Sequence, residues 1–159
     1  MTGTASWASL DRVAQFLAGN AKTLDRGDYD AWLEDFVEEC RYVVQSAENL
    51  DLGHDMPLMY ARNKNMLRDR IVSLRDANIY NIHRDRHVIG LPWLAAEADR
   101  VKAEAGIAVY QTDQNGYSTL FCVGAYRDTL VERDGSLRVL SREVVVDSFA
   151  VKRLLATPL

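Results

Sequence analysis

The sequence predicts an α+β fold in which helices pack into a strongly curved antiparallel sheet. Two turn signals, Asn115-Gly116 and Asp134-Gly135, separate β-rich runs between Gly106 and Phe149, which is the pattern of an antiparallel meander. Its middle segment, residues 117–131, would span roughly 50 Å if straight, whereas a chain of this length has a radius of gyration of about 15 Å. The sheet must therefore curl, and two long helical segments earlier in the chain can fill its concave face.

The first half of the chain supplies the helices. We expect a helix over residues 6–18, ended by Gly19-Asn20 or prolonged through residues 21–27 before a turn. A second long helix is expected over residues 63–75, because its apolar residues recur at helical spacing. Between the two helices the sequence predicts a short helix capped by Asp28 or Asp30 and running through Phe36, a strand at 41–45, a polar loop at 49–55 and an extended segment at 57–61.

The second half supplies most of the strands. Residues 87–91 form an apolar run closed by Pro92, which predicts a strand. Residues 93–105 are ambiguous, because their Ala, Glu and Lys content favours a helix while strict alternation begins at Val101. We choose a strand from Val101 into the meander. Gly124 lies in the middle of a strand and is expected to mark a bulge or a bend.

Length, charge and composition narrow the function classes. The 159 residues suit one domain, residues 1–159, and a net charge of −4 argues against a nucleic-acid partner. No apolar run is long enough to span a membrane, and the first residues lack the pattern of a secretory signal. Cys40 and Cys122 are far apart and outside any CxxC pattern, so we expect two buried free thiols and a cytoplasmic protein.

The histidines and glycines of the chain do not fall into a known metal-binding or catalytic motif. His83 and His87 are four residues apart, which on a strand corresponds to about 13 Å and prevents the two rings from sharing one ion. His54 lies in a separate loop. The chain has no GxSxG, P-loop, GxGxxG or HExxH pattern. We therefore predict no catalytic, cofactor-binding or metal-binding residues in this chain.

Two features of the sequence keep alternative interpretations open. The polar run 81–87 is locally basic, and is either a solvated loop before a strand or a docking surface for a carboxylate-bearing partner. A curled sheet can also enclose a pocket, in which a buried carboxylate would act as a base. Its candidate lining residues are Tyr42, Tyr60, Tyr110, Asp30 and Asp147, although the aromatic residues fit a core, and the carboxylates fit caps or the surface, at least as well.

Five blocks of the sequence, in order, resemble the small (β) subunit of aromatic-ring-hydroxylating dioxygenases. They cover most of residues 24–149, and residues 78–80 with 83–92 are most similar to members that act on aromatic acids such as terephthalate, salicylate or anthranilate. One departure is Ile82, where many members carry a proline. The blocks are Asp30-Ala31-Trp32-Leu33-Glu34-Asp35-Phe36, residues 66–75, residues 83–92, Gly124-Ala125-Tyr126-Arg127-Asp128-Thr129-Leu130, and residues 140–147.

The resemblance implies a cone-shaped barrel like those of nuclear transport factor 2 and ketosteroid isomerase. It also implies an α3β3 hexamer, in which the large α subunit holds a Rieske [2Fe–2S] cluster and a mononuclear iron. This chain lacks the two Cys and two His, suitably spaced, that a Rieske centre requires. We therefore expect a non-catalytic assembly subunit, with electrons reaching the large subunit from NAD(P)H through a reductase, with or without a ferredoxin.

The contacts with other subunits are expected on the face of the sheet. Arg84, Arg86, His87 and Trp93 are our candidates for part of them, since arginine and tryptophan are enriched at interfaces. The alternative hypothesis is a free-standing isomerase, cyclase or dehydratase of the same fold, or a small-ligand-binding protein, built on a buried Asp, Tyr and His pocket. A ligand-sized cavity with a perturbed carboxylate would favour that alternative.

Overall fold

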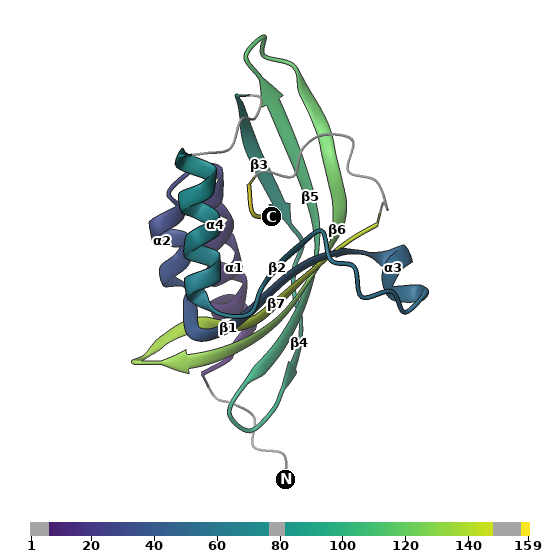
Figure 1. Cartoon of the computed structure of the whole chain (residues 1–159). Coiled ribbons are helices and arrows are strands. Elements are labelled where there is room, and N and C mark those ends of the chain that lie inside the picture. The colour runs from purple at the N-terminus through teal and green to yellow at the C-terminus, as the bar shows by residue number, and fades with distance from the viewer. Residues whose placement is uncertain (1–6, 77–81, 148–156) are drawn as a thin grey trace.

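A computed structural model describes residues 7–76, 82–147 and 157–159. It confirms the α+β class and the curved sheet, with three helices gathered on one side of long, twisted strands (Figure 1). None of the helices in these ranges is long and apolar enough to cross a membrane. The helices are α1 (Leu10–Asp25), α2 (Tyr29–Glu34), α3 (Ala47–Asp51) and α4 (Lys64–Asp76). The strands are β1 (Phe36–Ser46), β2 (Met59–Ala61), β3 (His83–Ile89), β4 (Trp93–Ala96), β5 (Val101–Asp113), β6 (Ser118–Arg133) and β7 (Ser136–Val146).

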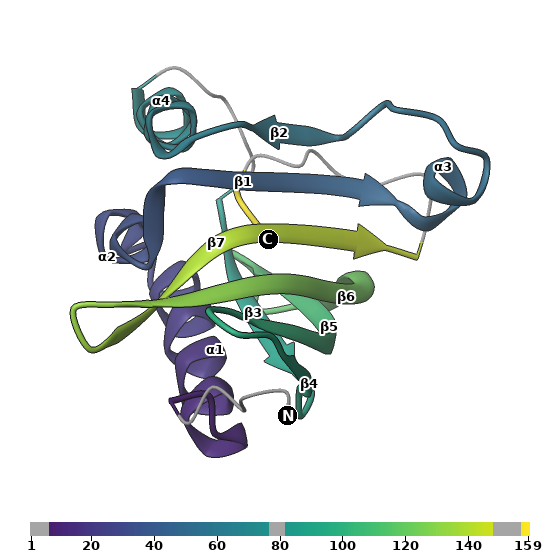
Figure 2. The same cartoon turned by 90° about the horizontal axis from the view of Figure 1, so that it is seen from below.

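The seven strands form one sheet in the order β2-β1-β7-β6-β5-β3, with β4 also paired to β5. β5, β6 and β7 are joined by antiparallel pairing and form the predicted meander. One pair departs from the prediction of an antiparallel sheet, because β1 runs parallel to β7. Figure 2 shows β1 and β7 pointing the same way, with α2 at the start of β1. The chain reaches β1 from the helices rather than from a hairpin, which allows the parallel direction.

The two hairpin turns lie at the predicted residues. Asp134 and Gly135 both have positive φ, 52° and 75°, which fits a type I′ turn between β6 and β7. Gly116 has a φ of 85° in the turn between β5 and β6, where the side chain of Asp113 accepts hydrogen bonds from the backbone N–H groups of Asn115 and Tyr117. Both turns therefore depend on residues that tolerate left-handed backbone.

Gly124 does not mark a bulge, contrary to that part of the prediction. It is paired in register with Ile107 on one side and Val146 on the other. A Cβ at this position would lie 2.0 Å from the carbonyl oxygen of Val145, so glycine is required because the β7 backbone approaches closely. The register instead shifts two pairs away, between Val109 and Tyr110 of β5, opposite residues 120–122 of β6. A second shift lies between Thr129 and Leu130 of β6.

Helix α1 continues through Gly19-Asn20, so the expected stop at residue 18 is wrong and the longer alternative is correct. The side chain of Asn20 is buried and hydrogen-bonded, and these tertiary contacts outweigh the local stop signal. The helix ends at Asp25, followed by Gly27 in the left-handed region with a φ of 69°. The N–H of Asp28 bonds to the carbonyl of Thr23 there, which satisfies a terminal helix carbonyl.

Three further segments differ from the prediction. Residues 49–51 of the expected polar loop belong to the short helix α3, which begins at Ala47 and is capped by Ser46. Residues 83–87 belong to strand β3 itself, so they are not a loop before it. Residues 93–96 form strand β4, which reverses at residues 97–100 into β5. The composition of residues 93–96 favours a helix, but hydrogen-bonded pairing with β5 outweighs that preference. Residues 77–81 and 148–156, which include parts of the predicted segments, lie outside the described residues.

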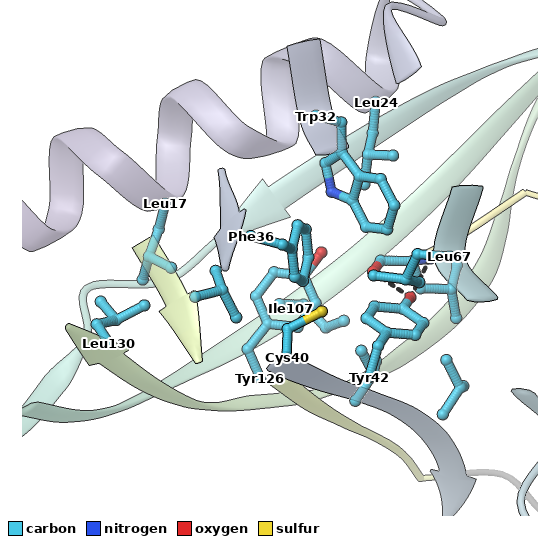
Figure 3. Packing of buried hydrophobic residues seen from close by; sticks show 14 of the residues in the cluster. Leu17, Leu24, Trp32, Phe36, Cys40, Tyr42, Leu67, Ile107, Tyr126 and Leu130 are labelled. Atoms are coloured by element: carbon cyan, nitrogen blue, oxygen red, sulfur yellow. Dashed lines mark hydrogen bonds between the residues drawn. The ribbon is translucent and has the colours of Figure 1, made fainter. Parts of the chain in front are cut away.

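The hydrophobic core lies between the helices and the concave face of the sheet. Trp32, Phe36 and Tyr42 point toward one another beneath α1 (Figure 3), with ring centroids 4.7 to 6.2 Å apart in edge-to-face arrangements. β5 contributes every second residue from Val101 to Val109, which confirms the alternation read from the sequence. Leu67 and Ile71 close the core from α4.

Candidate functional site

A charged pair is buried inside the curved sheet. Arg142 of β7 and Asp128 of β6 have no exposed side-chain surface. The Arg142 Nε and Nη2 atoms donate to the Asp128 carboxylate at 2.9 and 2.7 Å. Burial by itself would lower the pKa of Arg142, but the charge and hydrogen bonds of Asp128 outweigh it and hold the pKa above its ordinary value. The pair is therefore a fixed ion pair that compensates its own desolvation.

Asn20 of α1 extends this pair into a network. Its Oδ1 accepts from the Arg142 Nη1 at 2.6 Å, and its Nδ2 donates to Asp35 at 2.9 Å. Burial raises the pKa of Asp35, an effect that the Asn20 hydrogen bond and the nearby Arg138 and Arg142 charges oppose. The Arg142 guanidinium also stacks over the Tyr126 ring, 4.1 Å from its centroid. The network thus joins α1 to β6 and β7 and keeps Arg142 in one orientation.

The pocket predicted for a cone-fold enzyme is not assembled from the candidates named for it. Only Tyr42 lies in the interior, fully buried. Tyr60 and Tyr110 are 47% and 41% exposed, Asp147 is exposed, and Asp30 pairs with Arg75 at the surface. The interior is instead occupied by large side chains, with Trp32, Phe36, Tyr126 and Leu159 all buried there.

The alternation of inward- and outward-facing residues along a strand could have identified Arg142 and Asp128 as buried, although neither was among the predicted site residues. Arg142 is in phase with the inward-facing Val144 and Val146, and Asp128 is in phase with Tyr126 and Leu130. A charged residue at an inward position of each of two adjacent strands predicts a buried pair. Asn20 carried no such signal, because its position resembles a helix stop.

The edge strand β3 carries three of the four candidate interface residues, Arg84, Arg86 and His87, together with the second histidine, His83. His87 is buried and its Nδ1 lies 2.7 Å from the Asp25 carboxylate, which also accepts the His87 backbone N–H at 3.0 Å. His83 lies near Asp85, with its Nε2 3.2 Å from the carboxylate. The two histidines thus engage different carboxylates. Asp25 also blocks one backbone donor of the free β3 edge, which protects that edge from pairing with another strand.

Arg84 and Arg86 are exposed on β3, beside a groove of about 550 Å³. The Arg86 side chain is 76% exposed and lies 3.9 Å from Asp25. The groove also contains Arg26 and Tyr29, at the C-terminal end of α1 and the start of α2. Three arginines and two partly covered carboxylates therefore border this surface, which is suited to a partner that presents carboxylates.

The outer face of the sheet carries an apolar area, which we call the outer patch and define as Val88, Gly106, Ala108, Val123 and Ala125. Val88, Ala108 and Val123 are direct neighbours across β3, β5 and β6, and Gly106 and Ala125 form the adjoining pair. Val88 and Val123 are 53% and 40% exposed. Small residues at the centre make this surface flat enough for close contact with another surface.

A charged row borders the outer patch. Arg127 of β6 lies 3.5 Å from Glu143 of β7 and 4.0 Å from Glu104 of β5. Trp93, 68% exposed, pairs with Glu104 across β4 and β5 and lines a groove of about 320 Å³ with Arg41. An exposed tryptophan beside an apolar area with a charged rim is typical of a protein interface.

The described residues do not gather the ligands of a metal centre. In residues 7–76, 82–147 and 157–159, no group of three His, Cys, Asp or Glu residues is placed to hold a metal ion. The only two cysteines of the sequence, Cys40 on β1 and Cys122 on β6, lie on strands that are not neighbours in the sheet, and each is a buried free thiol. The residues present here therefore do not suit a Rieske cluster.

Comparison with known proteins decides the family. A family described as the ring hydroxylating beta subunit matches residues 19–153. The chain belongs to this family of β subunits. Its curated relatives include the small subunit of anthranilate 1,2-dioxygenase from Burkholderia cepacia, 40% identical over 86% of this chain and 85% of the relative. They also include subunit beta 2 of the terminal oxygenase component of terephthalate 1,2-dioxygenase from Comamonas sp, 36% identical over 93% and 97%.

A solved structure agrees with the fold of this β subunit. It is a chain assigned as the β subunit of an aromatic-ring-hydroxylating dioxygenase of Novosphingobium aromaticivorans, with 36% sequence identity and a TM-score of 0.85. The match covers 94% of this β subunit and 95% of that chain. These findings confirm the resemblance read from the five sequence blocks, including the similarity to anthranilate and terephthalate oxygenases.

Proposed function

We propose that this β subunit is the non-catalytic assembly subunit of an oxygenase that hydroxylates an aromatic acid. In this proposal a large subunit holds the Rieske cluster and the mononuclear iron, and a reductase supplies its electrons from NAD(P)H. The complex places oxygen from O2 on the ring. The names of the two curated relatives, which act on anthranilate and terephthalate, support an aromatic acid as the substrate class. The two cysteines lie on strands that are not neighbours in the sheet, and no group of three metal-ligating residues occurs among the described residues, which supports an iron site on the partner subunit.

The outer patch is the observation that carries the assembly role. Its apolar residues come from three strands that a continuous ladder holds in register, so the surface is rigid before any partner binds. No helix is needed to cover it in this proposal, because another subunit covers it in an α3β3 hexamer. The charged row of Glu104, Arg127 and Glu143 then forms a polar rim that fixes the register of the contact.

The four interface candidates contribute in different ways in this proposal. Arg84 and Arg86 present guanidinium groups at the β3 edge to carboxylates of the large subunit. Trp93 extends the contact beyond the outer patch. His87 contributes indirectly, because its buried ring contacts Asp25 and so positions that carboxylate beside Arg86.

The test is assembly with the large subunit after single substitutions. Val123→Asp in the outer patch, and separately Arg86→Ala and Trp93→Ala, should each weaken association by roughly 10- to 30-fold, the size expected at an interface hot spot. Circular dichroism should show an unchanged fold, because all three side chains are at least 40% exposed. Association is measured by light scattering across a dilution series.

Leu52→Asp is the matched control for Val123→Asp. Leu52 is 60% exposed and follows α3, outside the outer patch. It should assemble like the unmodified chain. If Val123→Asp, Arg86→Ala and Trp93→Ala all assemble as well as Leu52→Asp, the assigned surfaces are wrong.

A further inference from the structure

Residues 157–159 connect two strands that lie far apart in the sheet. The Thr157 Oγ1 donates to Asp85 of β3 at 3.0 Å, and the Leu159 backbone contacts Tyr42 of β1. Three strands, β7, β6 and β5, separate β1 from β3 in the sheet order. Three residues reach at most about 10 Å, so this short segment can contact both strands only by crossing the inside of the curl. Figure 1 shows the C mark between the helices and the strands β3 and β5.

Tyr42 binds the backbone of Leu159 from both sides of its hydroxyl group. The Tyr42 hydroxyl donates to the Leu159 oxygen at 2.8 Å and accepts from the Leu159 N–H at 2.9 Å. Tyr42 is fully buried, so these two bonds form without competition from water. The Leu159 side chain is 2% exposed and belongs to the same apolar cluster as Met59, Leu67 and Ile71.

This arrangement has the features of a ligand in a pocket. An apolar side chain fills an apolar space, and one buried polar group satisfies both a donor and an acceptor next to it. Covalent attachment explains why so small a group can stay bound, because its effective concentration at the site is high. The inside of the curl is therefore filled by two contributions, the aromatic residues and this segment.

We propose that the interior of the cone is a binding site for a small branched apolar group flanked by an N–H donor and an oxygen acceptor, and that residues 157–159 occupy it in cis. The ligand class follows from what Leu159 presents, an isobutyl group beside one N–H donor and one oxygen acceptor. The site is independent of the assembly role, since Tyr42 and Leu159 are buried and neither belongs to the outer patch. While the segment is in place, the chain has no room there for a foreign ligand.

The test compares the full chain with a chain shortened to residues 1–156. N-acetyl-L-leucine amide is added to both, and thermal unfolding is recorded with N-acetyl-D-leucine amide as the mirror-image control. The L compound should raise the melting temperature of the shortened chain and leave that of the full chain unchanged, and the D compound should shift neither. If the shortened chain keeps its circular dichroism spectrum and the L compound shifts nothing, or if the full chain binds it equally, the proposal is wrong.

A second variant keeps the test decisive if the shortened chain does not fold. Leu159→Ala retains both backbone bonds to Tyr42 and vacates the space of the isobutyl group. We expect a melting temperature lower by roughly 5–10 °C and a new xenon signal in 129Xe NMR that the unmodified chain lacks. Leu52→Ala is the matched control, because Leu52 is 60% exposed, and should change neither. No loss of melting temperature and no xenon binding in Leu159→Ala would overturn the proposal.

Discussion

Arg142 and Asp128 show how a single pair of residues can make the interior of this fold specific. Both charges are removed from water. The Asp128 carboxylate accepts hydrogen bonds from Arg142, and the Arg142 guanidinium also donates to Asn20 and stacks on the face of Tyr126. A buried pair of this kind adds little net stability compared with apolar side chains, but removing one member leaves the other charge uncompensated. The pair therefore constrains how α1 packs on β6 and β7.

We expect Asp128→Ala to lower the free energy of unfolding by about 3–5 kcal/mol, because it leaves the buried Arg142 guanidinium without its charge partner. Urea unfolding followed by circular dichroism measures this loss. The control is Asp99→Ala, which removes a carboxylate from the exposed pair with Arg100 and should leave the urea midpoint unchanged. Equal midpoints for the two variants would show that the Arg142 charge is compensated in another way.

The two cysteines give a prediction about pH. The pKa of Cys40 is raised from 9.0 to about 11 by burial, so between these values the unfolded chain has lost a proton that the folded chain keeps. The unfolded state then binds fewer protons, and the contribution of Cys40 to stability falls as the pH rises from 9 to 11. Alkylation by iodoacetamide at pH 8 should accordingly be slow in the native chain and fast in urea. Rapid native labelling of Cys40 or Cys122 would contradict the burial.

The elements that the sequence predicted well are those specified by local chemistry. The two glycine turns, the alternation from Val101 and the helix at residues 64–76 depend on residues close together in the chain. The errors occur where distant contacts decide. Asn20 continues a helix because Arg142 and Asp35 bind its side chain, and residues 93–96 form a strand because β5 offers them a partner.

Substitution of Gly124 tests how closely strands β6 and β7 must approach each other. Gly124→Ala should destabilise the chain by more than about 1 kcal/mol, because its Cβ would overlap the Val145 carbonyl oxygen at 2.0 Å and the β7 backbone would have to move. Gly106→Ala is the matched control on the neighbouring strand β5, since nothing lies within 4 Å of its Cβ. Urea midpoints of the two variants are compared. If they agree, β7 can move aside at no cost and the close approach does not constrain the sheet.

The molecule as a whole combines a filled interior with an exposed, apolar outer face. The fold class could be predicted from the meander and the length of its strands, and the family from five ordered blocks. The interior site could not be predicted, because it unites β1, β3 and residues 157–159, which only the curl of the sheet brings together. The outer patch could not be predicted from the sequence either, since it depends on the register of three strands.

The central claim is that this chain assembles with an iron-containing large subunit and holds no iron itself. The direct measurement is to express the chain alone and together with the large oxygenase subunit of the same organism, and to record mass by light scattering and iron content. We predict that the chain alone is free of iron, and that the co-expressed chain elutes in a larger complex that contains iron and both subunits. A chain that elutes separately from an iron-containing, active large subunit would contradict the account.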